Sequence, residues 1–434
     1  MNLGALSLED APGFWTPVRF FLTVPVFGVI AAIMLFLDGG QLFQSRWLPE
    51  TLAVAHVLTL GYIAMAMLGA LFQMLPVVMG TSFPQAERAA VIVHLLLVAG
   101  TLCLVLAFLM QVPVFFTAAV ALLVPVLILF GVGVIVAIFR AGKTRTTARA
   151  AQLAALGLIV TVVIGGYLAL GHAFEALSLH RGLTNYHAAW GIIGWILILA
   201  IGVSEQVIPM FLTTPPYPKL FNKWLVYLLI LFLCAGSLLP LQGVVQAAVV
   251  LVSFLMAAYA AVTLYLLGKR RRKRFDITNE FWRVGMLCLI LGAGVNVYGY
   301  FGGVIAGTDG SILSGLLLLA GFAVSIINGT LYKIVPFLVW LNLRMPVLMG
   351  KLKPGTRYYT PNIYEVIGMR PMKLQFMFHV AGLLLLVAAV FLKGLLIYVA
   401  ATAVLVSNLL LLLNLSHAAS LYRKYSGQIA VAQS

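Results

Sequence analysis

The sequence has few charged residues. Asp, Glu, Lys and Arg make up 9% of its 434 residues, whereas hydrophobic residues make up 63%. A water-exposed surface needs about 25–35% charged residues, so this composition excludes a soluble globular protein. Cysteine is also scarce, since only Cys103, Cys234 and Cys288 occur, each isolated in an apolar run. That scarcity excludes a disulfide framework and a cysteine-based zinc site.

Long apolar runs fill the chain instead. A membrane-spanning helix needs about 20 apolar residues, and continuous runs favour helices over the alternating strands of a membrane barrel. We therefore predict an all-α polytopic membrane protein with twelve transmembrane helices, which form a single membrane domain over residues 1–434. The twelve runs lie at residues 16–37, 50–75, 88–110, 113–140, 149–171, 186–212, 222–240, 243–268, 280–304, 311–338, 373–392 and 395–421.

The basic residues concentrate in alternate loops. The segments after the fourth, eighth, tenth and twelfth runs are rich in Lys and Arg, as in GKRRRKR at 268–274, and the other loops hold few. This positive-inside asymmetry predicts that the N and C termini lie in the cytoplasm. We interpret the net charge of +16 as an orientation signal beside anionic lipid headgroups, and no nucleic-acid partner is expected.

A pattern of glycine and proline recurs three times. It reads G-x7-G-x3-[Q/K]-x2-P and begins at Gly61, Gly194 and Gly321, in the second, sixth and tenth runs. An internal period of four helices indicates repeated structural units. We predict three four-helix modules, at approximately residues 1–145, 146–275 and 276–434, with pseudo-threefold symmetry.

The residue types in this pattern suggest their roles. The two glycines of each copy lie near one helix face and let neighbouring helices approach closely. Each proline frees a backbone carbonyl, for which Gln73, Gln206 or Lys333 is a candidate partner. A lysine at this depth is costly unless it is paired. Glu205 lies at the matching depth in the sixth run, so we hypothesise a Glu205–Lys333 pair near the central axis.

Histidine is the residue most suited to bind a metal here, because haem iron and copper both bind imidazole. The predicted topology places four of the seven histidines near the outer side of the membrane and three near the inner side. The outer group is His56, His172, His180 and His187, and the inner group is His94, His379 and His417. The inner histidines form a second site only if their helices meet.

The surroundings of the outer histidines differ. His56 stands in an apolar segment, which favours a ligand, whereas His180 lies in a loop and is more simply interfacial. For His187, a ligand role and an interfacial role are evenly balanced. His172, with Glu175 nearly one turn on, either binds a metal or forms a polar helix end.

Twelve helices, cytoplasmic termini and three four-helix modules resemble the catalytic subunit (subunit I) of the haem–copper oxidase superfamily, over nearly the whole chain. The segments AHVLTLGYIAMAMLGALFQMLPVVMG (55–80) and HAAWGIIGWILILAIGVSEQVIPMF (187–211) look like stand-alone, oxidase-like bacterial membrane proteins, which implies a location in the bacterial cytoplasmic (inner) membrane. The NnrS proteins, which contain haem and copper and are linked to nitric oxide stress, are relatives in the same broad group. The resemblance implies that His56 is an axial haem ligand near the outer face and that His187 roughly matches a copper or non-haem-metal ligand.

The sequence departs from that family at the catalytic centre. The tenth run, where the family has two haem-ligating histidines, contains none, and Leu316 aligns with His56 in the repeat. In the second module Ala189 takes this position, two residues after His187. Reduction of dioxygen is therefore not expected. The second axial ligand beside His56 would be His172, His187 or a group other than histidine.

Three functional hypotheses follow. In the first, the chain binds haem b on the subunit I fold without a complete binuclear centre, and acts as a divergent oxidoreductase or in nitric oxide and respiratory stress. In the second, it handles or transports copper or haem through its outer histidines. In the third, it is a cofactor-free scaffold. The expected partners are membrane lipid and, for electron exchange, a quinol, a cytochrome or a second membrane subunit.

Overall fold

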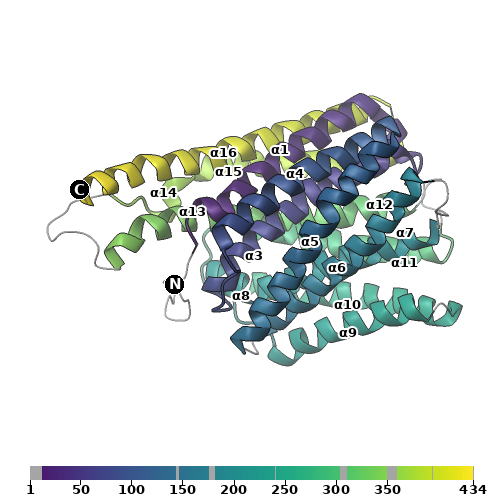
Figure 1. Cartoon of the computed structure of the whole chain (residues 1–434), viewed down its shortest axis with the longest axis horizontal. Helices are drawn as coiled ribbons and strands as arrows, with labels where there is room; N and C mark the ends of the chain where they lie inside the picture. The colour runs from purple at the N-terminus through teal and green to yellow at the C-terminus, as the bar shows by residue number, and fades with distance from the viewer. Residues whose placement is uncertain are drawn as a thin grey trace.

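The computed structural model describes residues 12–142, 146–174, 181–239, 241–303, 310–348, 359–392 and 394–433. These residues form helices joined by short connections, and the long helices run side by side in one bundle (Figure 1). Within the described residues, twelve helical spans are long and apolar enough to cross a membrane. The predicted all-α polytopic class and the predicted number of spans are thus confirmed.

Each span is one helix or a run of consecutive helical segments. The first half of the chain contains α1 (Trp15–Asp38), η2 (Gly39–Phe43), α2 (Pro49–His56), η3 (Val57–Ala64), α3 (Met65–Val77), α4 (Ala86–Met110), α5 (Pro113–Ala141), α6 (Thr146–Ala173), α7 (Arg181–Ala189), η4 (Trp190–Leu197) and α8 (Ile198–Leu212). The second half contains α9 (Lys219–Leu238), α10 (Gln242–Gly268), α11 (Ile277–Tyr300), α12 (Gly310–Leu316), η5 (Leu317–Ala323), α13 (Val324–Leu348), α14 (Ile363–Val366), α15 (Met369–Leu392) and α16 (Leu396–Gln433). The tenth and twelfth spans differ most from prediction, because they continue to Pro346 and Gln428.

Three of the spans contain a π-helical segment at the same place in the repeat. The segment η3 follows His56, η4 follows Ala189 and η5 follows Leu316, and these are the three positions that the glycine–proline pattern aligns. The segment η5 contacts both η3 and η4. π-Helical turns are rare and often mark functional sites, which directs attention to the side chains around these three segments.

The repeated glycines allow close helix packing. A Cβ at Gly61 would lie 2.2 Å from the Phe27 ring of α1, and the other glycines of the pattern lie similarly close to neighbouring side chains. The tightest approach to a backbone joins α6 to η4, where a Cβ at Gly157 would lie 2.3 Å from the carbonyl oxygen of Gly194. The predicted role of these glycines in packing is confirmed.

Replacement of Gly157 by alanine is expected to push α6 away from η4, because the new methyl group would overlap a backbone carbonyl. Overpacking of this kind costs about 1–3 kcal/mol, so the detergent-solubilised protein should melt at a lower temperature. Gly294→Ala in α11 is the matched control, since a Cβ there meets nothing within 4 Å. Equal melting temperatures of the two variants would contradict the close approach.

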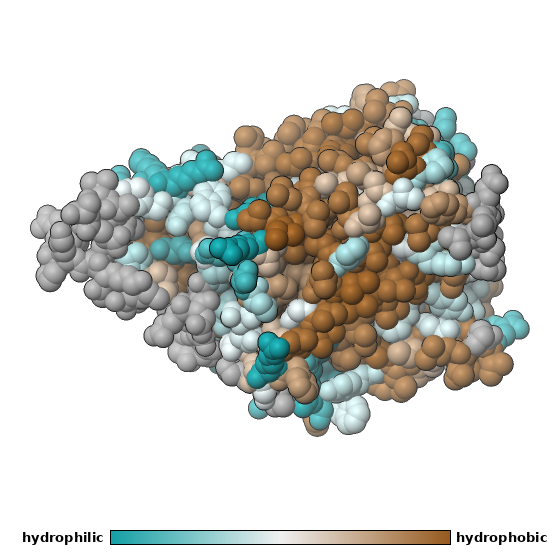
Figure 2. All heavy atoms as spheres, in the orientation of Figure 1, coloured by the Kyte–Doolittle hydropathy of each residue, from teal (hydrophilic) through white to brown (hydrophobic). Residues whose placement is uncertain are grey.

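The outside of the bundle is apolar. Leu37, Phe139 and Leu395 are 74%, 80% and 82% exposed. Figure 2 shows the apolar residues as a broad belt, with hydrophilic residues gathered towards the ends of the bundle. A patch of this extent on a soluble protein would drive aggregation, and its helices have the length of the bilayer core. The chain is therefore a multi-pass membrane protein that contacts lipid around its circumference.

The beginning of the first span and the end of the last span meet at one face of the bundle. The rings of Phe14 and Tyr422 stack with their centroids 3.8 Å apart. The guanidinium of Arg423 lies 4.7 Å from the ring centroid of Trp15. These contacts place both ends of the described chain on the same side of the membrane.

Candidate functional site

A cavity of about 1010 Å³ opens among the helices. Its lining residues are mostly aliphatic and come from all three predicted modules, including η3, α6, η4, α12 and α16. Among the described lining residues Arg46 is the only charged side chain. Cofactor sites are typically apolar cavities of this size with a few placed polar groups. Four histidines also line the cavity, namely His56, His172, His187 and His379.

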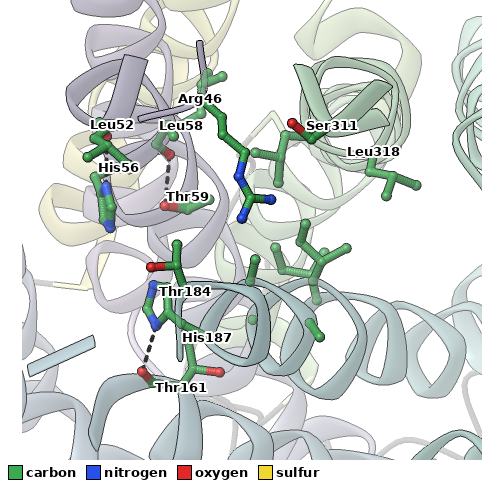
Figure 3. Close-up of a pocket in the computed structure, with 18 of the residues that line it drawn as sticks. Arg46, Leu52, His56, Leu58, Thr59, Thr161, Thr184, His187, Ser311 and Leu318 are labelled. Carbon is green, nitrogen blue, oxygen red and sulfur yellow. Dashed lines mark hydrogen bonds between the residues drawn. The ribbon is translucent and has the colours of Figure 1, made fainter. Parts of the chain in front are cut away.

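Two of these histidines face each other. The ring centroids of His56 and His187 are 6.1 Å apart and the ring planes differ by 21°. His56 ends α2 and His187 lies in α7, so the pair joins the first predicted module to the second. In Figure 3 both rings project from their helices into the same space.

Each of the two rings is held by a backbone carbonyl. Nδ1 of His56 lies 2.7 Å from the carbonyl oxygen of Leu52, and Nδ1 of His187 lies 3.0 Å from that of Thr161. A carbonyl oxygen only accepts, so Nδ1 donates in both rings and Nε2 keeps the lone pair of a neutral imidazole. Histidines that bind metals are usually oriented in this way. The dashed lines in Figure 3 show both contacts on the sides of the rings away from the shared space.

Neighbouring residues shape the space around the pair. A Cβ at Gly165 would lie 2.7 Å from Cε1 of His187, so a glycine is needed where α6 passes this ring. The Phe108 ring packs beside His56 with a centroid distance of 5.2 Å. Sequence reasoning missed Gly165, Thr161 and Arg46. The signals were the adjacent glycines at 165–166 and the presence of Arg46 in a loop with few basic residues.

His172 is not opposite His56. The Phe108 ring packs against both, with its centroid 5.2 Å from that of His56 and 5.8 Å from that of His172. The Phe116 ring stacks on His172, with the two ring centroids 5.1 Å apart. His172 thus belongs to an aromatic cluster that borders the pair.

The inner histidines lie in separate surroundings. Nε2 of His94 is 2.8 Å from Oγ1 of Thr23, and Nε2 of His379 is 2.8 Å from Oγ of Ser325. His417 is exposed on α16. Within the part of the chain that the structure describes, no three His, Cys, Asp or Glu side chains are grouped to hold a metal ion. The three inner histidines therefore do not form one site. His180 lies outside the described residues.

Lys333 has a different partner from the hypothesised one. Its Nζ lies 2.6 Å from Oδ2 of Asp276, whose Oδ1 accepts a hydrogen bond from the backbone N–H of Thr278 at the start of α11. Glu205 instead lies beside Thr147 of α6. The proposed Glu205–Lys333 pair is thus replaced by Asp276–Lys333, because α13 packs on α11 whereas α8 packs on α6.

Gln73 does not fill the role suggested for it either. Its side chain is 7% exposed, and neither amide atom has a hydrogen-bond partner among the described residues. The carbonyl that Pro76 frees is therefore not bonded by this glutamine. The glycines of the repeat act in packing as predicted, whereas Gln73 has no hydrogen-bond partner among the described residues and Lys333 pairs with Asp276.

Comparison with known proteins gives one partial likeness. The chain is 34% identical over 169 residues to an undecaprenyl-diphosphatase from Lactiplantibacillus plantarum, and the alignment covers 39% of this chain and 54% of that protein. No protein-family model matches the sequence. The chain thus spans about half the length of this curated relative, which is too little to assign it to the same family.

Proposed function

We propose that this chain is a haem-b-binding integral membrane protein in which His56 and His187 are the two axial ligands. The facing geometry of the pair carries the proposal. A histidine nitrogen binds a metal ion such as zinc at about 2 Å, so two imidazoles that held one iron between them would place their ring centroids about 6 Å apart. The observed separation is 6.1 Å, with both Nδ1 atoms directed to carbonyls.

The number of ligands favours haem over copper. In haem the porphyrin supplies four nitrogens, so two protein ligands complete the coordination of iron. Square-planar Cu(II) sites and blue-copper sites use three or more protein ligands, and among the described residues no three His, Cys, Asp or Glu side chains are grouped in this way. The large apolar cavity also suits a flat macrocycle. Copper or haem handling and a cofactor-free scaffold therefore stand as the alternative outcomes of the test below.

The proposed position accounts for a feature of the sequence. In the resembled family, helices corresponding to the second and tenth spans carry haem ligands, but the tenth span here has no histidine. A haem site between the second and sixth spans needs no histidine from the tenth span. We also propose that the three modules are related by pseudo-threefold symmetry, supported by the π-helical segments that follow His56, Ala189 and Leu316.

We place the termini in the cytoplasm and the chain in a bacterial inner membrane. The contact of Phe14 with Tyr422 puts both ends of the described chain on one side. The segments rich in Lys and Arg follow the fourth, eighth, tenth and twelfth spans, which puts them on the same side as the two ends of the chain. Basic loops are enriched on the cytoplasmic side of a membrane, which favours the cytoplasm for that side. The bacterial origin of the partly similar protein agrees with this location.

The two ligands limit the chemistry at the iron. Haem supplies a one-electron redox couple when bound. His56 and His187 would hold the iron with both imidazoles, each oriented by its contact with Leu52 or Thr161, which would favour electron transfer over catalysis at the metal. A role in redox or nitric oxide stress, with a quinol, a cytochrome or a second membrane subunit as electron partner, is consistent with this arrangement.

The partial likeness to undecaprenyl-diphosphatase offers a second candidate function, the hydrolysis of undecaprenyl diphosphate. A phosphoanhydride hydrolase needs groups that neutralise phosphate charge and activate water. The described residues that line the cavity include one cation, Arg46, and no carboxylate. The histidine pair therefore makes haem binding the better supported function.

The test is the absorption spectrum of the purified protein, oxidised and dithionite-reduced, together with iron and copper analysis. A b-type spectrum with stoichiometric iron is the expected result. A colourless protein would refute the proposal. Bound copper would then point to metal handling, and the absence of both metals would point to a scaffold.

Gly165→Ala is expected to lower the haem content and to produce high-spin iron signals. The added Cβ would lie 2.7 Å from Cε1 of His187 and would push this ring from its axial position. Gly315→Ala is the matched control, because Gly315 also lines the cavity but a Cβ there meets nothing within 4 Å. An unchanged spectrum in Gly165→Ala would count against His187 as a ligand.

A further inference from the structure

A run of six basic residues joins α10 to α11. Residues 269–274 read KRRRKR, and all of them except Arg270 are exposed. The two ion pairs found among the described residues involve Lys333 and Arg283, so none of the six side chains takes part in one. Like charges this close repel one another unless anions join them. The basic run, residues 269–274, therefore presents positive charge without a neutralising carboxylate among the described residues.

The residue that follows α8 holds the backbone of this run. Thr213 adopts a left-handed conformation there, with a φ of 54°, which is uncommon for a β-branched residue. Its carbonyl oxygen accepts the N–H of Arg271 at 2.9 Å, and its Oγ1 accepts the N–H of Arg272 at 3.2 Å. Two consecutive residues of the basic run are thus fixed against the end of a neighbouring span, whereas a run that served only as a charged spacer would need no such contacts.

Side chains from α14 and α15 complete the positive surface. Nη1 of Arg272 donates to Oη of Tyr364 in α14 at 2.6 Å. Nζ of Lys373 in α15 lies 4.5 Å from the ring centroid of Phe275, the residue that follows the run. Lys373 is exposed, so it adds one further positive charge at this end of the run. The basic run and Lys373 together are called the basic site below.

Exposed aromatic rings adjoin the basic site. Phe275 is exposed beside Lys373, and Tyr265 is exposed on α10, where Nζ of Lys269 lies 5.5 Å from its ring centroid. Phe254, also exposed, precedes Tyr265 by about three helical turns and so lies on the same face of α10. Aromatic rings are typical of the level where lipid headgroups meet the apolar core. A ligand that fits this surface therefore has an anionic headgroup and apolar chains.

We propose that the basic site binds the phosphate group of an anionic phospholipid in the leaflet on this side of the membrane, with the acyl chains along the exposed face of α10. A guanidinium binds phosphate oxygens in a two-pronged hydrogen-bonded geometry. Clusters of Lys and Arg directly beyond a membrane helix are typical of anionic-lipid sites. An acidic segment of a soluble protein would contact the same charges but would not use the apolar face of α10, so the surface favours a lipid.

A purely orienting role for these charges predicts a different result. Basic residues that only set the direction of the chain attract anionic lipid without a defined site. Any two cations on this side of the membrane would then contribute equally to lipid binding. Arg423 and Lys424 lie on the same side near the end of α16, where Arg423 packs over Trp15. They provide a control with the same change of charge at a different place.

The experiment measures the affinity of the detergent-solubilised full chain for phosphatidylglycerol and for phosphatidylcholine by native mass spectrometry. We expect the wild type to prefer phosphatidylglycerol. Arg271→Gln with Arg272→Gln should weaken the binding of phosphatidylglycerol by about fivefold for each charge removed and leave phosphatidylcholine unaffected. Both changes keep the backbone contacts with Thr213, and Gln at 272 keeps an N–H donor for Tyr364. Arg423→Gln with Lys424→Gln should keep the full preference.

A second variant and a soluble probe complete the test. Lys373→Gln removes a single charge on α15, so it carries the test if the double variant does not fold, with an expected loss of about fivefold. Equal losses in the basic-site and α16 variants, or equal binding of the two lipids by the wild type, would overturn the inference. Glycerol phosphate that bound as tightly as phosphatidylglycerol would show that the acyl chains contribute nothing, and would overturn the choice of a lipid.

Discussion

Alanine at His56 or at His187 abolishes the b-type spectrum of the purified protein, if these residues bind the iron. Each change removes one of the two imidazoles whose ring centroids lie 6.1 Å apart. Loss of an outer group that only orients a ligand already costs about 10–100-fold in metal affinity, so loss of the ligand itself should cost at least as much. The measurement is the haem content per chain and the dithionite-reduced spectrum of each variant.

The other histidines provide controls within the same chain. His94→Ala and His417→Ala should keep the spectrum, because His94 bonds to Thr23 and His417 is exposed on α16. His172→Ala should change it only slightly, since His172 packs against the pair through Phe108. A spectrum that depends on His172 and is indifferent to His187 would show that the axial pair has been assigned wrongly.

Added imidazole offers a direct check on the role of the missing side chain. The cavity left by His187→Ala is open to a small ring, and imidazole can bind haem iron as the side chain does. Partial return of the wild-type spectrum with imidazole is expected for His187→Ala. If the variant unfolds instead, imidazole has no effect and the melting temperature falls, whereas a stable variant with an unaltered spectrum contradicts ligation.

The twelve spans were predictable because lipid imposes one simple rule on the sequence. A helix that crosses the hydrocarbon core needs about 20 consecutive apolar residues, and the described chain contains these spans where the apolar runs lie. The glycine spacing was equally informative, since only a residue without Cβ allows the approach seen where Gly61 meets Phe27. Both inferences depend on local sequence alone.

The pairing of His56 with His187 was not predictable in the same way. The sequence left His172, His187 or a group other than histidine as the second axial ligand, because the tenth span contains no histidine. The repeat aligns His56 with Ala189, two residues after His187. Two residues correspond to a rotation of about 200° around a helix. His187 therefore projects from a different side of its helix than a residue at the position of Ala189, which aligns with His56. This difference lets the rings of His56 and His187 face each other. Only the packing of one module on another reveals this.

The prediction that Lys333 pairs with Glu205 was wrong for a related reason. Glu205 and Lys333 share a depth in the membrane, but depth says nothing about lateral position. Each span that carries the glycine–proline pattern packs on the span before it in the chain, so Glu205 approaches Thr147 of α6 and Lys333 approaches Asp276 at the start of α11. The acidic residue just before the ninth span was the signal in the sequence.

Neutralising either member of the Asp276–Lys333 pair is expected to destabilise the protein by about 3 kcal/mol, the lower end of the range for breaking a buried ion pair. The two side chains are 17% and 12% exposed, so a lone charge left there is poorly hydrated. Lys333→Met leaves the carboxylate unpaired. Asp276→Asn leaves the ammonium unpaired and retains an oxygen for the N–H of Thr278. Thermal unfolding in detergent measures both effects.

The double variant distinguishes a true pair from two independent losses. Asp276→Asn with Lys333→Met removes both charges, so it should be more stable than the sum of the two single changes implies. Glu205→Gln with Lys333→Met should show simple additivity, since Glu205 lies beside Thr147. Single variants as stable as the wild type would reduce the pair to a solvated contact worth under about 1 kcal/mol. Coupling of Lys333 to Glu205 in place of Asp276 would instead restore the pairing that depth alone suggested.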